Sequence, residues 1–215
     1  MELFSLLFIT FCFACQALSA AVGDSKPGWI TKQVAMSDGS TDTLYSRDTF
    51  VHAGIEARKH NETAKFRFEG GDAQRSCESV IMARAPWITP AEAQKCADLG
   101  IQILGQPGYW EGWDWPGGHN TYSLARLADC EFGIARVDGL DSQAKFGNLD
   151  VGYLLGNVSD AQNGLVVDSG VVQVGGSMRC LGAPMSFTVG KTAWPLADVE
   201  SEKKGKPRRA ERWSN

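Results

Sequence analysis

The sequence predicts an α+β fold in which two helices pack on a mainly antiparallel sheet and two disulfides hold the layers together. Three observations indicate this fold. Apolar and polar residues alternate late in the chain, two segments have the apolar spacing of helices, and the cysteines that follow an apolar leader are even in number. The 215 residues suffice for one ordinary domain, and a net charge of −4 argues against a surface that binds nucleic acid.

The beginning of the chain has the pattern of a secretory signal peptide. An uncharged apolar run from Leu3 to Ala17 precedes a stretch of small residues, so we expect residues 1–20 to be removed. The run is preceded by Glu2 and by no basic residue, which is atypical of a signal peptide. An uncleaved membrane anchor is therefore the alternative. The run is short for a membrane span and no later window is long enough, so we expect a secreted, extracellular protein with no stable membrane insertion.

Composition divides the rest of the chain into three regions. Residues 21–76 are polar with short alternating patches, and we interpret them as an N-terminal arm with weak strands. We expect the compact α+β module over residues 77–194. Residues 195–215 form a basic tail. From Ser201 to Asn215 it has six basic and two acidic residues and almost no apolar residue except Trp213, which predicts disorder.

Two segments have helical spacing. The first is predicted to begin at Thr89, because Thr89, Pro90 and Glu92 have the order of a capping box with proline at the first helical position. Cys96 lies on the apolar side of this helix. The second is predicted to begin at Asn148 or shortly after. Its apolar stripe consists of Val151, Leu154, Leu155 and Val158.

Strand patterns are strongest near the end of the module. Alternate residues from Val172 to Cys180 are apolar or small, and the same alternation from Met185 to Val189 predicts the return strand of a hairpin. The stretch from Cys130 to Ile134 alternates in the same way. Cys130 and Cys180 are therefore expected to point into the core.

Four cysteines remain after removal of the leader: Cys77, Cys96, Cys130 and Cys180. In an oxidising compartment this even number predicts two disulfides, for which three connectivities exist. The spacing fits no zinc site, so we expect no metal. Since Cys96 faces inward from the first helix and Cys130 from the next strand, we predict that these two pair and that Cys77 pairs with Cys180.

Two sequons, at Asn61 and Asn157, agree with export and are candidate glycosylation sites. Asn61 lies in a strongly polar stretch. Asn157 is predicted to lie on the second helix, away from its apolar stripe, so that a glycan there would point away from the core.

One aromatic segment is a candidate contact site. Its residues are Tyr109, Trp110, Glu111, Trp113, Asp114 and Trp115. The first interpretation is a loop that folds over the end of the sheet and packs its rings. The second is contact with a ligand or partner, and the third is glycoside chemistry with Glu111 and Asp114 as acid and base.

We expect no catalytic residue and no cofactor, and hence no enzyme. The three histidines fit no metal-binding motif, and the chain contains no serine nucleophile elbow and no phosphate-binding loop. The four cysteines, as disulfide partners, supply no free nucleophile.

Four elements in a fixed order carry a family resemblance. They are Cys96 with Leu99, and the segments 129–134 (DCEFGI), 146–151 (FGNLDV) and 174–180 (VGGSMRC). Together they resemble the fungal extracellular-protein-two effector domain, a family of proposed necrosis-inducing factors. The resemblance covers roughly Cys77 to Val189, with Glu131 where the family has a small residue. It implies a secreted fungal protein, similar to killer toxins, without catalytic residues.

The expected function is that of a secreted, non-enzymatic effector or toxin-like virulence protein that acts on host or competitor cells, with necrosis as one implied outcome. Its partner would be a host or competitor target. The alternative is a carbohydrate-binding or carbohydrate-active cell-wall protein, in which a Trp-rich loop of residues 109–119 contacts polysaccharide.

Overall fold

The computed structural model describes residues 29–47, 65–113, 115, 121–140, 142–167 and 169–191. The predicted signal peptide, the Asn61 sequon, Asp114 and the predicted basic tail lie outside these residues.

A seven-stranded antiparallel sheet forms the centre of the fold, in the order β1-β2-β7-β8-β12-β11-β4. Its strands are β1 (Trp29–Ala35), β2 (Thr41–Arg47), β4 (Cys77–Arg84), β7 (Tyr122–Leu127), β8 (Cys130–Arg136), β11 (Val174–Cys180) and β12 (Ala183–Gly190). The β11–β12 hairpin, a late part of the described chain, lies inside the sheet between β8 and β4.

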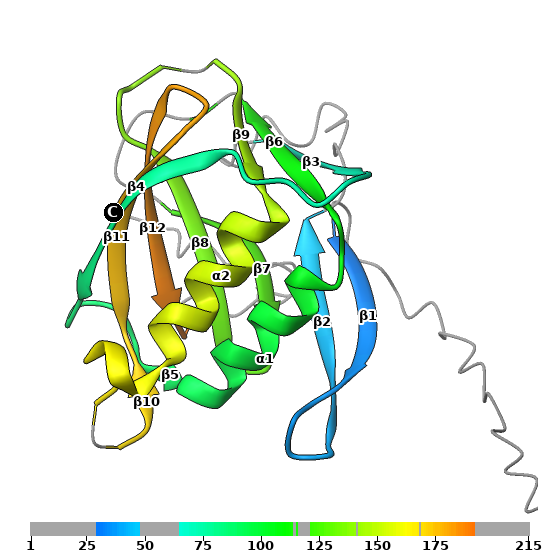
Figure 1. Cartoon of the computed structure of the whole chain (residues 1–215), viewed down its shortest axis with the longest axis vertical. Helices are drawn as coiled ribbons and strands as arrows, with labels where there is room; N and C mark the ends of the chain where they lie inside the picture. Colours follow the sequence, from blue (N-terminus) through cyan, green and yellow to red (C-terminus); the bar gives the residue numbers. More distant parts are fainter. Residues whose placement is uncertain are drawn as a thin grey trace, which may run out of the picture.

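Two smaller sheets complete the strand framework. β3 (Lys65–Gly70), β6 (Gly108–Trp113) and β9 (Ala144–Gly147) form an antiparallel sheet in the order β3-β6-β9. β5 (Ala91–Glu92) and β10 (Val171–Val172) form a short pair. The three-stranded sheet stands beside one end of β2 and the helices (Figure 1).

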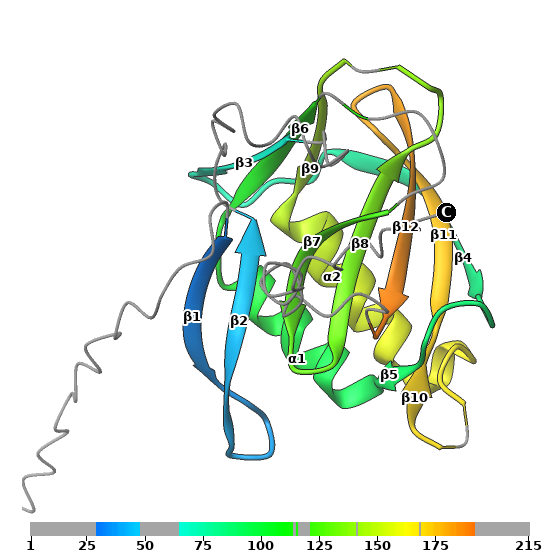
Figure 2. The ribbon, with the colours of Figure 1, turned by 180° about the vertical axis from the view of Figure 1, so that it is seen from behind.

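Both helices lie on one face of the seven-stranded sheet (Figure 1), and the opposite face is seen from behind (Figure 2). They are α1 (Ala93–Leu104) and α2 (Asn148–Ser159), and a 3₁₀ turn, η2 (Ala161–Asn163), follows α2. The two helices pack closely because small residues meet between them. A Cβ on Gly100 would lie 3.0 Å from the backbone oxygen of Gly152.

The core fills the layer between the helices and the sheet. Phe132 of β8 and Phe187 of β12 stack there with ring centroids 6.1 Å apart, and both side chains are buried. Leu99 and Ile103 of α1 and Leu155 of α2 are fully buried. Each such side chain stabilises the fold by about 1.5–3 kcal/mol. The predicted α+β class, with two helices on an antiparallel sheet, is confirmed.

The second helix begins at Asn148 as predicted, but the capping box predicted for the first helix is wrong. α1 begins at Ala93, with Glu92 as its N-cap and no hydrogen bond from a capping side chain. The preceding residues are extended because Ala91 pairs with Val172 in the β5–β10 ladder. This long-range pairing replaces the local cap that the sequence pattern suggested.

Strands β1 and β2 lie within the segment interpreted as a polar arm. They extend the sheet because β2 pairs with β7, with Leu44 opposite Leu127. Leu44, Val34 and Met36 are buried in the core. The sheet therefore includes residues that precede Cys77.

The start of α2 is tied to the chain just before β4. Asn148 is fully buried, and its Oδ1 accepts a hydrogen bond from the backbone N–H of Gln74 at 3.0 Å. Asp150 accepts hydrogen bonds from the backbone N–H groups of Ser76 at 2.6 Å and Gly147 at 2.8 Å. These contacts fix where β4 begins.

We expect Gly147→Ala to lower the free energy of unfolding by about 3 kcal/mol, measured by urea denaturation. A Cβ at residue 147 would lie 1.9 Å from the backbone oxygen of Gln74, so the backbone must move. Gly156→Ala is the control, because a Cβ there meets nothing within 4 Å. Alanine in place of this helical glycine should stabilise the protein by about 0.5–1 kcal/mol. Equal effects of the two substitutions would contradict the prediction.

Candidate functional site

The tryptophan-rich segment begins as a strand, and its prediction as a loop is wrong for residues 109–113. β6 pairs with β3 on one side and with β9 on the other. Its side chains alternate strictly between buried and half-buried positions. The aromatic segment therefore has an inner and an outer face.

The inner face belongs to the core. Trp110 is fully buried, its ring centroid lies 4.9 Å from that of Phe68, and its Nε1–H donates a hydrogen bond to the backbone oxygen of Arg47 at 3.0 Å. Trp115 is also buried and contacts the ring of Phe66 edge-on, with centroids 5.3 Å apart. The packing interpretation thus holds for these two rings, which present no open face to a ligand.

The outer face of the three-stranded sheet is half-buried and carries both charges and aromatic rings. We call this set the β6 outer face, and its residues are Arg67, Glu69, Tyr109, Glu111, Trp113 and Lys145. Lys145 Nζ lies 2.7 Å from Glu111 Oε1 and 4.7 Å from the centroid of the Tyr109 ring. Arg67 and Glu69 form a second ion pair.

The charges of the β6 outer face are mutually paired. The hydrogen bond from Lys145 to Glu111 raises the pKa of Lys145 above its ordinary value. One face thus brings together three of the predicted contact residues, Tyr109, Glu111 and Trp113. Asp114, the second carboxylate of the predicted acid–base pair, lies outside the described residues. No local pattern in the sequence pointed to Lys145, whose role depends on the β6–β9 pairing.

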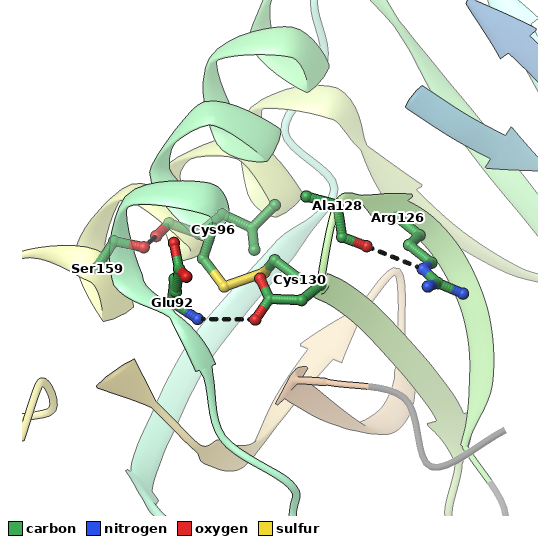
Figure 3. The surroundings of a disulfide bond; sticks show 8 residues. Glu92, Cys96, Arg126, Ala128, Cys130 and Ser159 are labelled. Carbon is green, nitrogen blue, oxygen red and sulfur yellow. Dashed lines mark hydrogen bonds between the residues drawn. A yellow bond between two sulfur atoms is a disulfide. The ribbon is translucent and has the colours of Figure 1, made fainter. Parts of the chain in front are cut away.

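Both predicted disulfides are present. Cys96 of α1 is bonded to Cys130 of β8, and both residues are fully buried. Beside this bond, the backbone N–H of Glu92 donates to Asp129 at 3.3 Å (Figure 3). Cys77 and Cys180 stand opposite each other in the β4–β11 ladder and form the second bond. One disulfide fastens a helix to the sheet, and the other closes an edge of the sheet.

Other predicted features can be located on the same framework. Asn157 is exposed on α2, as expected for its sequon. Among the residues that the structure describes, no three or more His, Cys, Asp or Glu side chains gather where they could hold a metal ion. In the same part of the chain, no helix is both long and apolar enough to cross a membrane.

Residues 75–180 match the model of the Hce2 family, whose description reads "Pathogen effector; putative necrosis-inducing factor". We call residues 75–180 the Hce2-matched segment. The match confirms the predicted family resemblance. No curated protein matches the chain. The Hce2-matched segment begins just before Cys77 and ends at Cys180, so one disulfide joins its two ends.

The residues that carry the family resemblance in the sequence maintain the fold. Cys96 and Cys130 link α1 to β8, and Asn148 and Asp150 hold the start of α2 against the chain before β4. Gly176 lets β11 lie against its neighbours, because a Cβ there would be 2.2 Å from the backbone oxygen of Ile81. The motif therefore describes a scaffold, and the contact residues are to be sought elsewhere.

Glu131, which stands where the resemblance led us to expect a small residue, has an unusual environment. It lies opposite Arg126 in the β7–β8 ladder, on the sheet face turned away from the helices. Its Oε2 and the Oγ of Ser123 are buried and form no hydrogen bond of ordinary geometry in the described part of the chain. Burial raises the pKa of Glu131 to about 7, although the nearby Ser123 hydroxyl and the charges of Arg126 and Arg47 favour the ionised form.

We expect the stability of the protein to fall as the pH rises from about 4.5 to about 7. In this range the folded protein retains a proton on Glu131 that the unfolded chain releases, so ionisation favours unfolding by up to about 3 kcal/mol. Urea denaturation as a function of pH measures the effect. Glu131→Gln should remove this part of the pH dependence and stabilise the protein at neutral pH. An unchanged pH profile in the Glu131→Gln variant would contradict the assignment to this carboxyl.

Proposed function

We propose that the protein is a secreted effector that acts on host or competitor cells by binding through its folded surface, without catalysis. The family description supports action as a pathogen effector. Two disulfides are consistent with an oxidising compartment outside the cytosol.

The observation that carries this proposal is that the Hce2-matched segment is covalently closed. Cys77–Cys180 joins the ends of the matched segment, and Cys96–Cys130 fastens its first helix to the sheet. Such cross-links limit opening of the fold where chaperones and reducing systems do not protect it. A stable, persistent surface suits a protein that functions by contact.

We assign the contact to the β6 outer face. Half-buried Tyr109 and Trp113 give it aromatic area, while the Lys145–Glu111 and Arg67–Glu69 pairs give it charge. Aromatic residues surrounded by polar groups are typical of protein contact surfaces. The pairing of the charges within the face lowers the cost of covering them when a partner binds.

The test is application of the purified protein to host tissue and to competitor cells. A response such as cell death is expected to require both disulfides and to survive Asp114→Asn, which removes one carboxylate of the candidate acid–base pair. Loss of the response in the Asp114→Asn variant, with the fold intact, would favour catalysis.

A second comparison tests the location of the contact. Trp113→Ala should weaken the response, while Trp87→Ala should not, although Trp87 is 81% exposed. The reverse outcome would place the contact elsewhere. Retention on insoluble chitin, glucan or cellulose would support the carbohydrate-binding alternative, for which only Tyr109 and Trp113 of the β6 outer face supply rings.

A further inference from the structure

We propose that Asn157 carries an N-linked glycan that covers the depression between the end of α2 and β4. The inference rests on the proposed export of the protein, because the oligosaccharide is added in the secretory pathway. The acceptor sequence is Asn157-Val158-Ser159. It lies in the last turn of α2.

The helix presents Asn157 to solvent and the next residue to the core. Asn157 is exposed, whereas Val158 is fully buried. The backbone oxygen of Asn157 accepts a hydrogen bond from Asn163 Nδ2 at 2.8 Å, which fixes the backbone at this point. Among the described residues, the side-chain amide of Asn157 makes no hydrogen bond that a sugar would break.

The surface beside Asn157 is hollowed. A depression of about 300 Å³ is lined by Met82 of β4, Asn157, Asn163 and Leu165. Met82 and Leu165 are partly exposed and offer apolar atoms. A sugar attached to Asn157 therefore has room to lie in the depression and apolar surface against which its ring can pack.

The transfer forms one bond and breaks one. The side-chain nitrogen of Asn157 bonds to the anomeric carbon of a lipid-linked oligosaccharide, and the bond from this carbon to the lipid diphosphate breaks. The lipid diphosphate leaves with the bonding electrons, and the nitrogen gives up one proton. In the folded protein the Ser159 hydroxyl donates to the backbone oxygen of Leu155 at 2.8 Å, so it is engaged in the helix. The transfer accordingly precedes the folding of α2.

A glycan at this site also protects the edge of the large sheet. β4 is an end strand of the seven-stranded sheet, and it exposes Val80 and Ile81. Edge strands with exposed apolar side chains pair readily with other chains. A bulky, polar group beside Met82 hinders such pairing.

Peptide mass mapping of the full chain secreted from a eukaryotic host tests the occupancy. Enzymatic release of N-glycans in ¹⁸O water converts a glycosylated asparagine to labelled aspartate. We expect the label at residue 157 and its complete loss in Asn157→Gln and in Ser159→Ala. Ser159→Thr, which preserves the sequon, should retain it. The same variants are also made in a chain that carries Asn61→Gln, so that the glycan at Asn157 is distinguished from one at Asn61.

If the protein is secreted with its disulfides formed but Asn157 is unmodified, the inference about the glycan is wrong. The proposed export would still stand. Retention of the protein inside the cell would instead count against export. In that case the same mapping, with a heterologous secretory leader in place of residues 1–20, decides the glycan separately.

Oxidation by dilute peroxide tests where the glycan lies. Met82 should oxidise more slowly in the glycosylated protein than after enzymatic deglycosylation, because the sugar covers it. Met178 is the internal control, since it is only 4% exposed and far less open to the reagent in either form. Equal oxidation of Met82 in the two forms would overturn the proposed coverage.

Discussion

Replacing Cys77 and Cys180 together with alanine is expected to lower the free energy of unfolding by about 4–5 kcal/mol. The two residues are separated by 103 positions, so the bond removes much conformational freedom from the unfolded chain. A single domain has only about 5–15 kcal/mol of stability in total. Loss of this bond should therefore remove between about a third and nearly all of the stability, and urea denaturation of the purified variant measures the loss.

The second disulfide provides the comparison. Cys96 and Cys130 close a shorter loop, with a separation of 34 positions, and their removal is expected to cost just under about 4 kcal/mol from loop entropy. Both sulfur atoms belong to buried residues, so alanine also leaves a small cavity. If neither double variant changes the urea midpoint, the disulfides do not stabilise the fold and the prediction fails.

Substitution of Trp110 by alanine is expected to destabilise the protein by about 3–5 kcal/mol. The ring is fully buried against Phe68, and its Nε1–H bonds the backbone oxygen of Arg47 at 3.0 Å, which connects the three-stranded sheet to the end of β2. The alanine variant loses the packing and leaves the part-buried carbonyl oxygen of Arg47 without this donor. Thermal and urea denaturation measure the change.

Two further variants separate these contributions. Trp110→Phe keeps much of the apolar area and removes the donor, so we expect an intermediate loss. Trp87→Ala removes the same type of side chain from an exposed position and should change stability by less than about 0.5 kcal/mol. A large loss of stability in Trp87→Ala together with no loss in Trp110→Ala would show that the burial of these two rings has been misassigned.

Sequence patterns predicted the elements whose apolar residues follow one clear period. In β11, Val174, Met178 and Cys180 are buried as their alternation indicated, and α2 begins at Asn148. The disulfide pairing followed from the same inward-facing positions. These features were accessible because burial and local periodicity agree.

Elements defined by distant partners were harder to predict. β6 carries rings on both faces, with Tyr109 and Trp113 outside and Trp110 inside, so its hydrophobicity does not alternate even though its burial does. β2 contains few apolar residues, and β1 and β2 owe their place in the sheet to pairing with each other and to the pairing of β2 with β7. The burial of Glu131 likewise depends on the assembled sheet, and a lone glutamate in a strand gave no local sign of it.

The strand order also constrains how the molecule assembles during synthesis. β4 pairs only with β11 within the seven-stranded sheet, and β11 emerges from the ribosome long after it. Cys77 must consequently persist as a thiol while Cys96 and Cys130 are already available to each other. Early oxidation of Cys77 to either of those two cysteines would form a non-native cross-link, and such a molecule would need disulfide exchange to reach the native pairing.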